Sequence, residues 1–364
     1  MKNRKGVDKK ELTSLFLELV QIDSPTGEVE DFRQYLEDFF IKKGFRGGRD
    51  KYGNLIFKTL DFNPKNSLLL TSHIDTVQSG RGIKPIVEEN IIRSEGDTIL
   101  GADPKSGIAS ILYAINDSGA ENLRDLEFIF STNEEEGVHT LNYAEVSSGK
   151  ALVLDHGAPV NEILAFSPFA YVFLIEVKGK RVYAQTDYSS GANAIEALCK
   201  MINSLPWGFY KKGCIANTGK IIGGEANTIV APYASLEGNI YCFDKNDREE
   251  YIDRIRRTAK EVDKEFGTTT TVKLPEEYEG TYPDLNAKTF QTLKKIYQKN
   301  GVDINFSREF IISSNNCLAT KKIDSVNIGL GYKKHHTWEE EISISQWSKF
   351  TDILMEFLFS EHMK

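Results

Sequence analysis

The sequence predicts an α/β fold with a central, mostly parallel mixed sheet flanked by helices, and with a smaller α+β domain inserted into it. Three apolar runs, at residues 67–71, 127–131 and 151–154, each lead into acidic or histidine side chains. Short apolar runs of this kind are typical of buried parallel strands. From Leu12 to Phe45 the apolar residues instead recur at helical spacing. After residue 168 the pattern changes, which indicates the inserted domain.

The expected boundaries follow from chain length and pattern. At 364 residues the chain exceeds one typical core. We expect a first domain formed by residues 1–167 and 279–364, with the inserted domain at 168–278. Within the insert the pattern predicts strand, helix, two strands, helix and strand, in that order, at residues 170–177, 192–205, 214–222, 234–243, 247–266 and 268–274. This order is the split βαβ, or ferredoxin-like, arrangement.

Each predicted helix of the insert has an apolar stripe that we expect to be buried. The stripe of the first helix comprises Ile195, Leu198, Ile202 and Leu205. The stripe of the second comprises Tyr251, Ile255, Ala259, Val262 and Phe266, and Gly267 is a suitable C-cap.

Composition excludes several classes of partner. Lys plus Arg number 45 against 53 Asp plus Glu, so the net charge is −8 and nucleic acid is not expected to bind. No segment approaches the roughly 18 apolar residues that span a bilayer, so we expect neither membrane insertion nor export. The cysteines lack CxxC spacing and have apolar neighbours, which predicts reduced, buried thiols and a cytoplasmic protein: Cys199, Cys214, Cys242 and Cys317.

Histidine and carboxylate side chains follow the predicted strands where an open α/β sheet collects ligands. His73 and Asp75 follow the first run, Glu134 and Glu135 follow the second, and Asp155 directly follows the third. Because the carboxyl ends of parallel strands lie at one edge of a sheet, these side chains can converge although they are far apart in sequence. Asp103 and His336 complete the set.

These residue types suit two close divalent cations. With one bridging carboxylate, each ion requires one imidazole and one further carboxylate. Five residues meet this count: His73, Asp103, Glu135, Asp155 and His336. Three ligand carboxylates against two dications leave a formal charge of plus one, which lowers the pKa of a shared water. Glu134 would then act as the proton shuttle, and Asp75 as an acceptor that fixes the tautomer of His73.

Each motif by itself has an ordinary explanation. A His-x-Asp pair is often a surface loop, an acidic run is often a solvated turn, and Asp103 or Asp155 could form a turn or a helix cap. Their joint occurrence after apolar runs favours a metal site.

The segments TSHIDTV, LGADPKSG, STNEEEGVHT, LVLDHG and HHTWEEE resemble, in order and spacing, the M20 family of dinuclear zinc peptidases, most closely its peptidase T-like branch. The resemblance covers nearly the whole chain. It implies that His73 and Asp155 hold one zinc, that Glu135 and His336 hold the other, and that Asp103 bridges them. It also implies that Glu134 is the general base and that the insert is a lid or dimerisation domain through which two chains could pair.

Two details of the ligand motifs refine this expectation. Either of two adjacent histidines could be the last ligand, and we choose His336 over His335 because Thr337 and Glu340 follow it at the family's HTxxE spacing. Relatives usually carry a second acidic residue after the bridging Asp, with a cis peptide between the two. Here Pro104 follows instead, which lowers the cost of a cis bond to roughly 0.5–1 kcal/mol and predicts that the bond is cis.

Four residues are candidates for substrate binding, and they depart in part from the family. Tyr183 replaces a histidine that donates to the oxyanion, and Tyr241 replaces an arginine that holds a carboxylate. Asn316 is retained within SSNNCL, and Asn227 lies in IIGGEANTIV, where the resemblance implies a contact with the reacting carbonyl.

The sequence therefore predicts metal-dependent hydrolysis of short peptides. An Asp at position 155 is similar to the members that remove amino-terminal residues, so we expect an aminopeptidase or tripeptidase. Two alternatives are an N-acyl amino-acid amidohydrolase, which would use the same activated water, and an inactive peptide-binding homologue, which the tyrosines at 183 and 241 favour.

Overall fold

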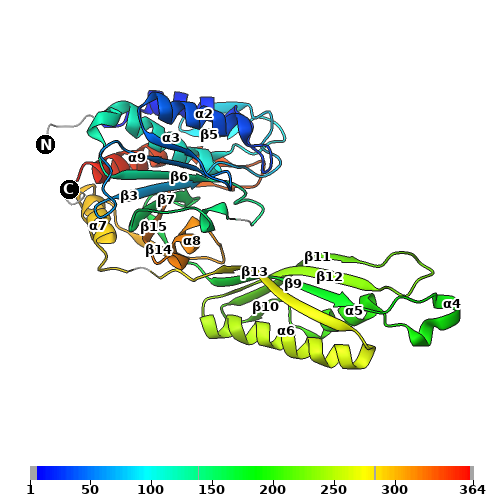
Figure 1. Cartoon of the computed structure of the whole chain (residues 1–364). Coiled ribbons are helices and arrows are strands. Elements are labelled where there is room, and N and C mark those ends of the chain that lie inside the picture. Colours follow the sequence, from blue (N-terminus) through cyan, green and yellow to red (C-terminus); the bar gives the residue numbers. More distant parts are fainter. Residues whose placement is uncertain (1–5, 138, 283, 361–364) are drawn as a thin grey trace. The chain divides into compact units, whose positions relative to one another are not determined.

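The computed structural model describes residues 6–137, 139–282 and 284–360 and divides into two compact units (Figure 1). The first unit comprises Met1–Phe166, Tyr282–Arg308 and Ser313–Lys364. The second comprises Ser167–Thr281 and Glu309–Ile312. The second unit is therefore an insertion into the chain of the first.

An eight-stranded mixed sheet forms the centre of the first unit, in the order β1-β2-β6-β3-β7-β15-β8-β14. The neighbours β6, β3, β7 and β15 are parallel to one another, whereas β1, β2 and β6 pair antiparallel. The strands are β1 (Arg46–Arg49), β2 (Leu55–Lys58), β3 (Leu68–His73), β6 (Leu126–Ser131), β7 (Lys150–His156), β8 (Glu162–Phe166), β14 (Asn305–Arg308) and β15 (Asp324–Gly329).

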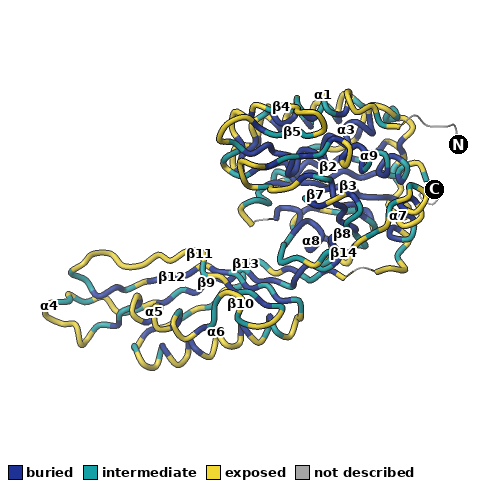
Figure 2. The backbone as a smooth tube through the Cα atoms, turned by 180° about the vertical axis from the view of Figure 1, so that it is seen from behind, coloured by how far each residue is buried: buried dark blue, intermediate teal, exposed yellow. Residues whose placement is uncertain are grey.

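Helices cover both faces of this sheet, which explains why its central strands β3 and β6 are buried along their whole length. Leu152 and Leu154 of β7 belong to the main core, whereas the equally buried Ala151 and Val153 alternate with them and face the other side. Figure 2 shows the buried strands between partly exposed helices. The helices that share the main core are α1 (Lys9–Val20), α2 (Glu30–Lys42), α3 (Ala102–Ser118), α7 (Lys288–Lys299) and α9 (Ile344–Leu358), and α8 (Ser314–Thr320) packs against β7 and β15.

A four-stranded antiparallel sheet, in the order β16-β17-β5-β4, also belongs to the first unit. Its strands are β4 (Pro85–Glu88), β5 (Ile91–Ser94), β16 (Tyr332–Lys333) and β17 (Glu341–Ser343). The turn between β16 and β17 carries His336.

The second unit is a five-stranded antiparallel sheet, in the order β10-β11-β12-β9-β13, with two long helices packed against it. Without the short β10, the order is that of a split βαβ unit, and the predicted fold class is confirmed. The elements are β9 (Phe169–Lys178), α4 (Ala184–Asp187), α5 (Ala194–Ser204), β10 (Gly208–Lys211), β11 (Cys214–Gly223), β12 (Tyr233–Cys242), α6 (Lys245–Phe266) and β13 (Thr269–Tyr278).

The apolar stripe predicted for α5 is partly wrong. Ile195 is 40% exposed, and the residues that α5 buries are Ala194, Ala197, Leu198 and Met201. Asn193 caps the helix by accepting from the backbone N–H groups of Ile195 and Glu196, and small alanines then face the sheet. For α6 the prediction is confirmed for the first four of its five residues, Tyr251, Ile255, Ala259 and Val262. Gly267 is a left-handed C-cap with φ of 68°.

The prediction of reduced, buried cysteines is wrong for three of the four and holds for Cys317. Cys214 and Cys242 lie directly opposite each other on β11 and β12 and form a disulfide, and Cys199 is exposed. The pairing depends on the strand register, which spacing alone does not reveal. The cysteines therefore give no argument for a reducing compartment.

The two ends of the inserted segment are hydrogen-bonded to each other. The backbone N–H of Thr281 donates to the carbonyl of Ser167 (3.1 Å), and the backbone N–H of Ser167 donates to Thr281 Oγ1 (2.9 Å). Phe166 and Tyr282, the next residue on each side, have ring centroids 6.0 Å apart. The chain thus leaves the first unit and returns to it at neighbouring points.

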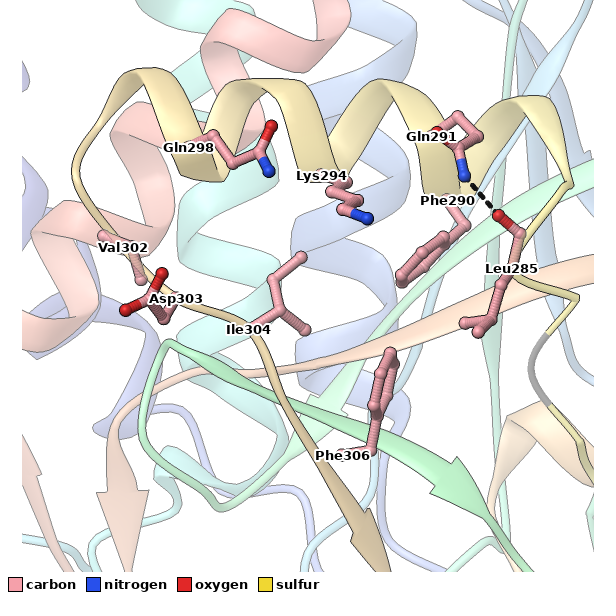
Figure 3. Close-up of a pocket in the computed structure, with 9 residues that line it drawn as sticks. All are labelled: Leu285, Phe290, Gln291, Lys294, Gln298, Val302, Asp303, Ile304 and Phe306. Atoms are coloured by element: carbon pink, nitrogen blue, oxygen red, sulfur yellow. Dashed lines mark hydrogen bonds between the residues drawn. The ribbon is translucent and has the colours of Figure 1, made fainter.

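Two further features bear on function. A pocket of the first unit lies between α7 and β14 and is lined by Phe290, Ile304 and Phe306 among others, but by none of the predicted ligands (Figure 3). Within the described ranges, no helix combines the length and the apolar content needed to cross a bilayer.

Candidate metal centre

The predicted ligands converge at the carboxyl ends of adjacent strands. His73 is the last residue of β3, Asp155 lies near the end of β7, and Glu134 and Glu135 follow β6. Because β6, β3 and β7 are parallel neighbours, their ends meet at one edge of the sheet. Asp103 joins them from the first turn of α3.

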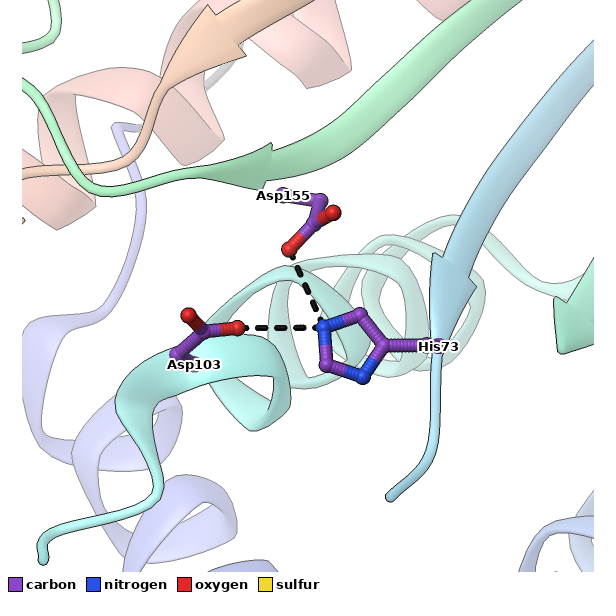
Figure 4. Close-up of side chains that lie close together, drawn as sticks. All are labelled: His73, Asp103 and Asp155. Carbon is purple, nitrogen blue, oxygen red and sulfur yellow. Dashed lines mark hydrogen bonds and ion pairs between the residues drawn. The ribbon is translucent and has the colours of Figure 1, made fainter. Parts of the chain in front are cut away.

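The first group consists of His73, Asp103 and Asp155 (Figure 4). His73 Nε2 lies 3.1 Å from Asp103 Oδ1 and 3.2 Å from Asp155 Oδ1. The other ring nitrogen, Nδ1, donates to the backbone carbonyl of Asp75 at 2.9 Å, because a carbonyl oxygen only accepts. In neutral His73 this tautomer leaves the Nε2 lone pair facing the carboxylates, as a metal ligand requires.

The second group consists of Asp103, Glu135 and His336. His336 Nε2 lies 2.8 Å from Glu135 Oε2 and 3.5 Å from Asp103 Oδ2. Of the two adjacent histidines, His336 is therefore the one that faces the carboxylates. It has a left-handed backbone, with φ of 63°, in the loop between β16 and β17.

Asp103 is common to both groups. One of its carboxylate oxygens faces His73 and the other faces His336, which is the arrangement of a bridging ligand. Its backbone is not helical (φ −83°, ψ 111°) although it lies in the first turn of α3, and the Asp103–Pro104 peptide bond is cis, as predicted.

The centre is a cluster of buried carboxylates whose negative charge requires positive charge nearby. Burial raises the pKa of Glu134, Glu135 and Asp155. Burial also acts to lower the pKa of His73, but the nearby carboxylates, Asp155 foremost, outweigh it and hold that pKa well above its usual value. Hydrogen bonds that His336 donates to the carboxylates of Asp103 and Glu135 raise the pKa of His336 to about 10. Protons on the imidazoles thus balance charge that a metal ion would otherwise balance.

The residues present fit two divalent cations. Glu135 Oε1 is buried and has no hydrogen-bond partner among the described residues, although Oε2 of the same side chain faces His336. A buried carboxylate oxygen without a donor is costly unless a cation meets it. Imidazole nitrogen together with carboxylate oxygen is a donor set that zinc accepts.

Comparison with known proteins gives a consistent result. Residues 172–267 match the family model described as a peptidase dimerisation domain of the M20 type. The whole chain is similar to the crystal structure of a tripeptidase from Staphylococcus aureus, with a TM-score of 0.81, 27% identity, and coverage of 97% of this chain and 98% of the other. The chain thus contains a match to an M20-type dimerisation domain and resembles a tripeptidase over nearly its whole length.

Two further similarities extend over nearly the full length. The crystal structure of the aminopeptidase PepT from Bacillus cereus matches with a TM-score of 0.78 and 27% identity, over 97% of this chain and 98% of that one. The protein YqjE from Bacillus subtilis, which is described as uncharacterized, is 27% identical over 97% of this chain and 98% of its own. The chain thus resembles an aminopeptidase PepT and a tripeptidase across both of its units.

Asp75 contacts more of the site than the sequence indicated. Its Oδ1 lies 3.5 Å from His73 Nδ1, farther than its own backbone carbonyl. The carboxylate instead accepts the backbone N–H groups of Glu134 (3.2 Å) and Glu135 (3.3 Å). Thr26 Oγ1 donates to the same carboxylate at 2.7 Å. Asp75 therefore holds the loop that carries both glutamates, and Thr26, which sequence reasoning missed, orients Asp75.

Removal of the Thr26 hydroxyl is expected to weaken the site without unfolding the chain. Thr26→Val keeps the shape of the buried side chain but leaves Asp75 with one donor fewer, so the Glu134–Glu135 loop loses part of its support. We expect activity to fall about 10- to 100-fold, the usual cost of losing a residue that supports a metal ligand. Steady-state kinetics measure the effect, and Thr258→Val, at a buried threonine of α6, is the control. An unchanged rate would show that Thr26 has no such role.

The four predicted substrate residues lie in different places. Tyr183, which is 48% exposed, and Asn227, which lies in an exposed turn, belong to the second unit. Tyr241 is partly buried on β12, opposite Ala170 and Ile215. In the first unit, Asn316 is fully buried, and its Oδ1 accepts from the backbone N–H of Ser313 in the capping box of α8. Their role in substrate binding stays a prediction.

Proposed function

We propose that this protein is a metal-dependent peptidase that releases amino-terminal residues from short peptides, with His73, Asp103, Glu135, Asp155 and His336 as the ligands of two divalent cations, most readily zinc. The observation that carries the proposal is the position of Asp103, whose two oxygens face His73 and His336 separately. The two histidines fall in separate ligand groups that share only this carboxylate, which favours two cation positions over one. The similarity to a tripeptidase and an aminopeptidase over the full length supports peptides as the substrate class.

When bound, two such cations would supply a Lewis acid for the scissile carbonyl and lower the pKa of water. The chain itself would supply the proton transfer. Glu134 is largely buried, with Oε2 4.0 Å from His73 Nε2 and Oε1 3.5 Å from His139 Nδ1. Burial, together with the charges of Asp155 and Glu135, raises the pKa of Glu134, which is the direction that a general base at neutral pH requires. Glu134 would take a proton from the attacking water and return it to the leaving amine.

A metal analysis combined with a substrate panel tests this proposal. We expect two divalent ions per chain and hydrolysis of tripeptides that have a free amino terminus. The same peptides with an acetylated amino terminus should be resistant, because an aminopeptidase recognises the free amine. Preferential cleavage of N-acyl amino acids would instead favour an amidohydrolase. Two bound ions without any hydrolysis would favour a peptide-binding homologue, and either result would refute the proposal.

We also propose that two chains pair through the second unit. Support comes from the match to a peptidase dimerisation domain and from β11. Strand β10 pairs with only residues 214–216 of β11, so the outer edge from 217 to 223 has no partner strand among the described residues, and Ile221 and Ile222 on it are exposed. Light scattering should give a mass about twice the 41.1 kDa of one chain. A mass of one chain at micromolar concentration would contradict the pairing.

A further inference from the structure

Glu340 is a buried carboxylate at the end of the turn that carries His336. It is fully buried and lies just before β17, which begins at Glu341. Its two oxygens accept three backbone N–H groups of one distant loop: Oε2 accepts from Leu100 (2.8 Å) and Gly101 (2.7 Å), and Oε1 accepts from Asp103 (3.0 Å).

These contacts replace the missing cap of α3. The helix begins at Ala102, and its N-cap residue, Gly101, has no side chain that could accept from the first N–H groups. Gly101 has a φ of 74°, a conformation that favours glycine, so a conventional capping side chain is not available there. The negative charge of Glu340 at this end also matches the positive end of the helix dipole. The start of α3 therefore depends on a residue more than two hundred positions away.

The same contacts connect two of the predicted ligands. Within the turn, the Glu340 N–H donates to the carbonyl of Thr337 (3.1 Å), and the Thr337 N–H donates to the carbonyl of Lys334 (3.3 Å), so the segment around His336 is closed on itself. The carboxylate then joins this closed turn to the backbone N–H of Asp103. Asp103 Oδ2 and His336 Nε2 face each other at 3.5 Å across this junction.

We propose that Glu340 is a positioning residue that sets the distance between Asp103 and His336 and so forms the cation group of Asp103, Glu135 and His336. Both of its oxygens accept from backbone N–H groups, so it acts through Asp103 and His336 and not as a ligand itself. The inference rests on the proposed function, since it concerns a site for two cations. The proposal predicts that a substitution of Glu340 weakens cation binding at Asp103, Glu135 and His336 more than cation binding at His73, Asp103 and Asp155. In the latter group, His73 and Asp155 are held by strands β3 and β7 of the sheet.

Glu340→Gln tests the proposal. The amide has nearly the same size but offers only one acceptor oxygen, and its NH₂ would face backbone N–H donors. We expect the purified variant to keep the wild-type circular dichroism spectrum and to bind one of the two zinc ions about 10- to 100-fold more weakly in competition with a chelator. Peptidase activity should return towards the wild-type kcat as zinc is added, a rescue that a merely structural defect would not show.

Glu339→Gln is the matched control. Glu339 is exposed, lies on the same turn and pairs with Lys334 Nζ at 2.9 Å, so this change removes the same charge one residue away. It should bind both ions as the wild type does. Should Glu340→Gln not fold, Glu340→Asp, which keeps the charge on a shorter side chain, should fold and show intermediate zinc affinity.

Three outcomes would overturn the assignment. In the first, Glu340→Gln folds and binds both ions with wild-type affinity. In the second, added zinc does not restore the activity of Glu340→Gln. In the third, neither Glu340→Gln nor Glu340→Asp folds, which would make Glu340 a residue of the fold alone. The proposed function fails in a different way. If the wild-type protein binds two ions but hydrolyses no peptide, the peptidase proposal is wrong, and the zinc titrations of the variants still decide the role of Glu340.

Discussion

Glu134→Gln is expected to retain two divalent ions per chain and to lose turnover by about 100- to 10,000-fold, the range that a positioned general base contributes. Glutamine fills the same space but cannot accept the proton of the attacking water. The ligand oxygens of Asp103, Glu135 and Asp155 are unchanged, so the metal content should not fall. The decisive measurement is kcat on a free tripeptide, with the metal content of the same sample measured alongside.

The chain offers a matched control for this variant. Glu136 follows the two glutamates on the same loop and is exposed, so Glu136→Gln removes one charge without touching the cluster. It should hydrolyse the peptide at nearly the wild-type rate. If Glu134→Gln also did so, Glu134 would not be the base. If it lost metal as well as activity, Glu134 would belong with the ligands instead.

Asp103→Ala is expected to lose metal and activity together. Asp103 is the one residue that belongs to both candidate groups, so its removal leaves two protein ligands on each side. Two ligands bind a cation far more weakly than three, and the metal content after dialysis should fall from two ions to fewer than one per chain. Added zinc raises the melting temperature only of a protein that binds it in the folded state, so the thermal shift of the wild type should disappear in the variant.

The adjacent histidines give a control for the metal assignment. His336 faces Glu135 and Asp103, whereas the ring of His335 packs against Tyr332 with 5.9 Å between centroids. His336→Ala should therefore lose one ion and His335→Ala should keep both. The reverse result would move the last ligand by one residue. A wild-type metal content in Asp103→Ala would refute the bridging role altogether.

Much of the centre could be predicted from the sequence because its geometry follows from strand order. His73, Glu135 and Asp155 each follow an apolar run, and parallel strands bring such positions to one edge. His336 required more, since no apolar pattern distinguishes it from His335. Only the spacing of Thr337 and Glu340 pointed to it, and the structure places its ring, rather than that of His335, against the carboxylates.

The supporting contacts could not be predicted in the same way. Thr26 lies 49 residues from Asp75, and Glu340 lies 237 residues from Asp103, so neither contact leaves a periodic signal in the chain. A capping residue is normally sought within the first turn of its own helix, and α3 obtains its cap from elsewhere. The Cys214–Cys242 pair likewise depends on the register of two strands. Ile195 belongs to the apolar stripe of its helix but is exposed, so the stripe locates the buried face only to within about one residue.

The adjoining ends of the inserted segment have a practical consequence for dissecting the molecule. Ser167 and Thr281 are already within hydrogen-bonding distance, so a short linker between Phe166 and Tyr282 would reconnect the remaining polypeptide without stretching it. The only other residues of the second unit are Glu309–Ile312. Replacing residues 167–281 by such a linker would leave β3 and β7, which carry His73 and Asp155, uninterrupted in the chain.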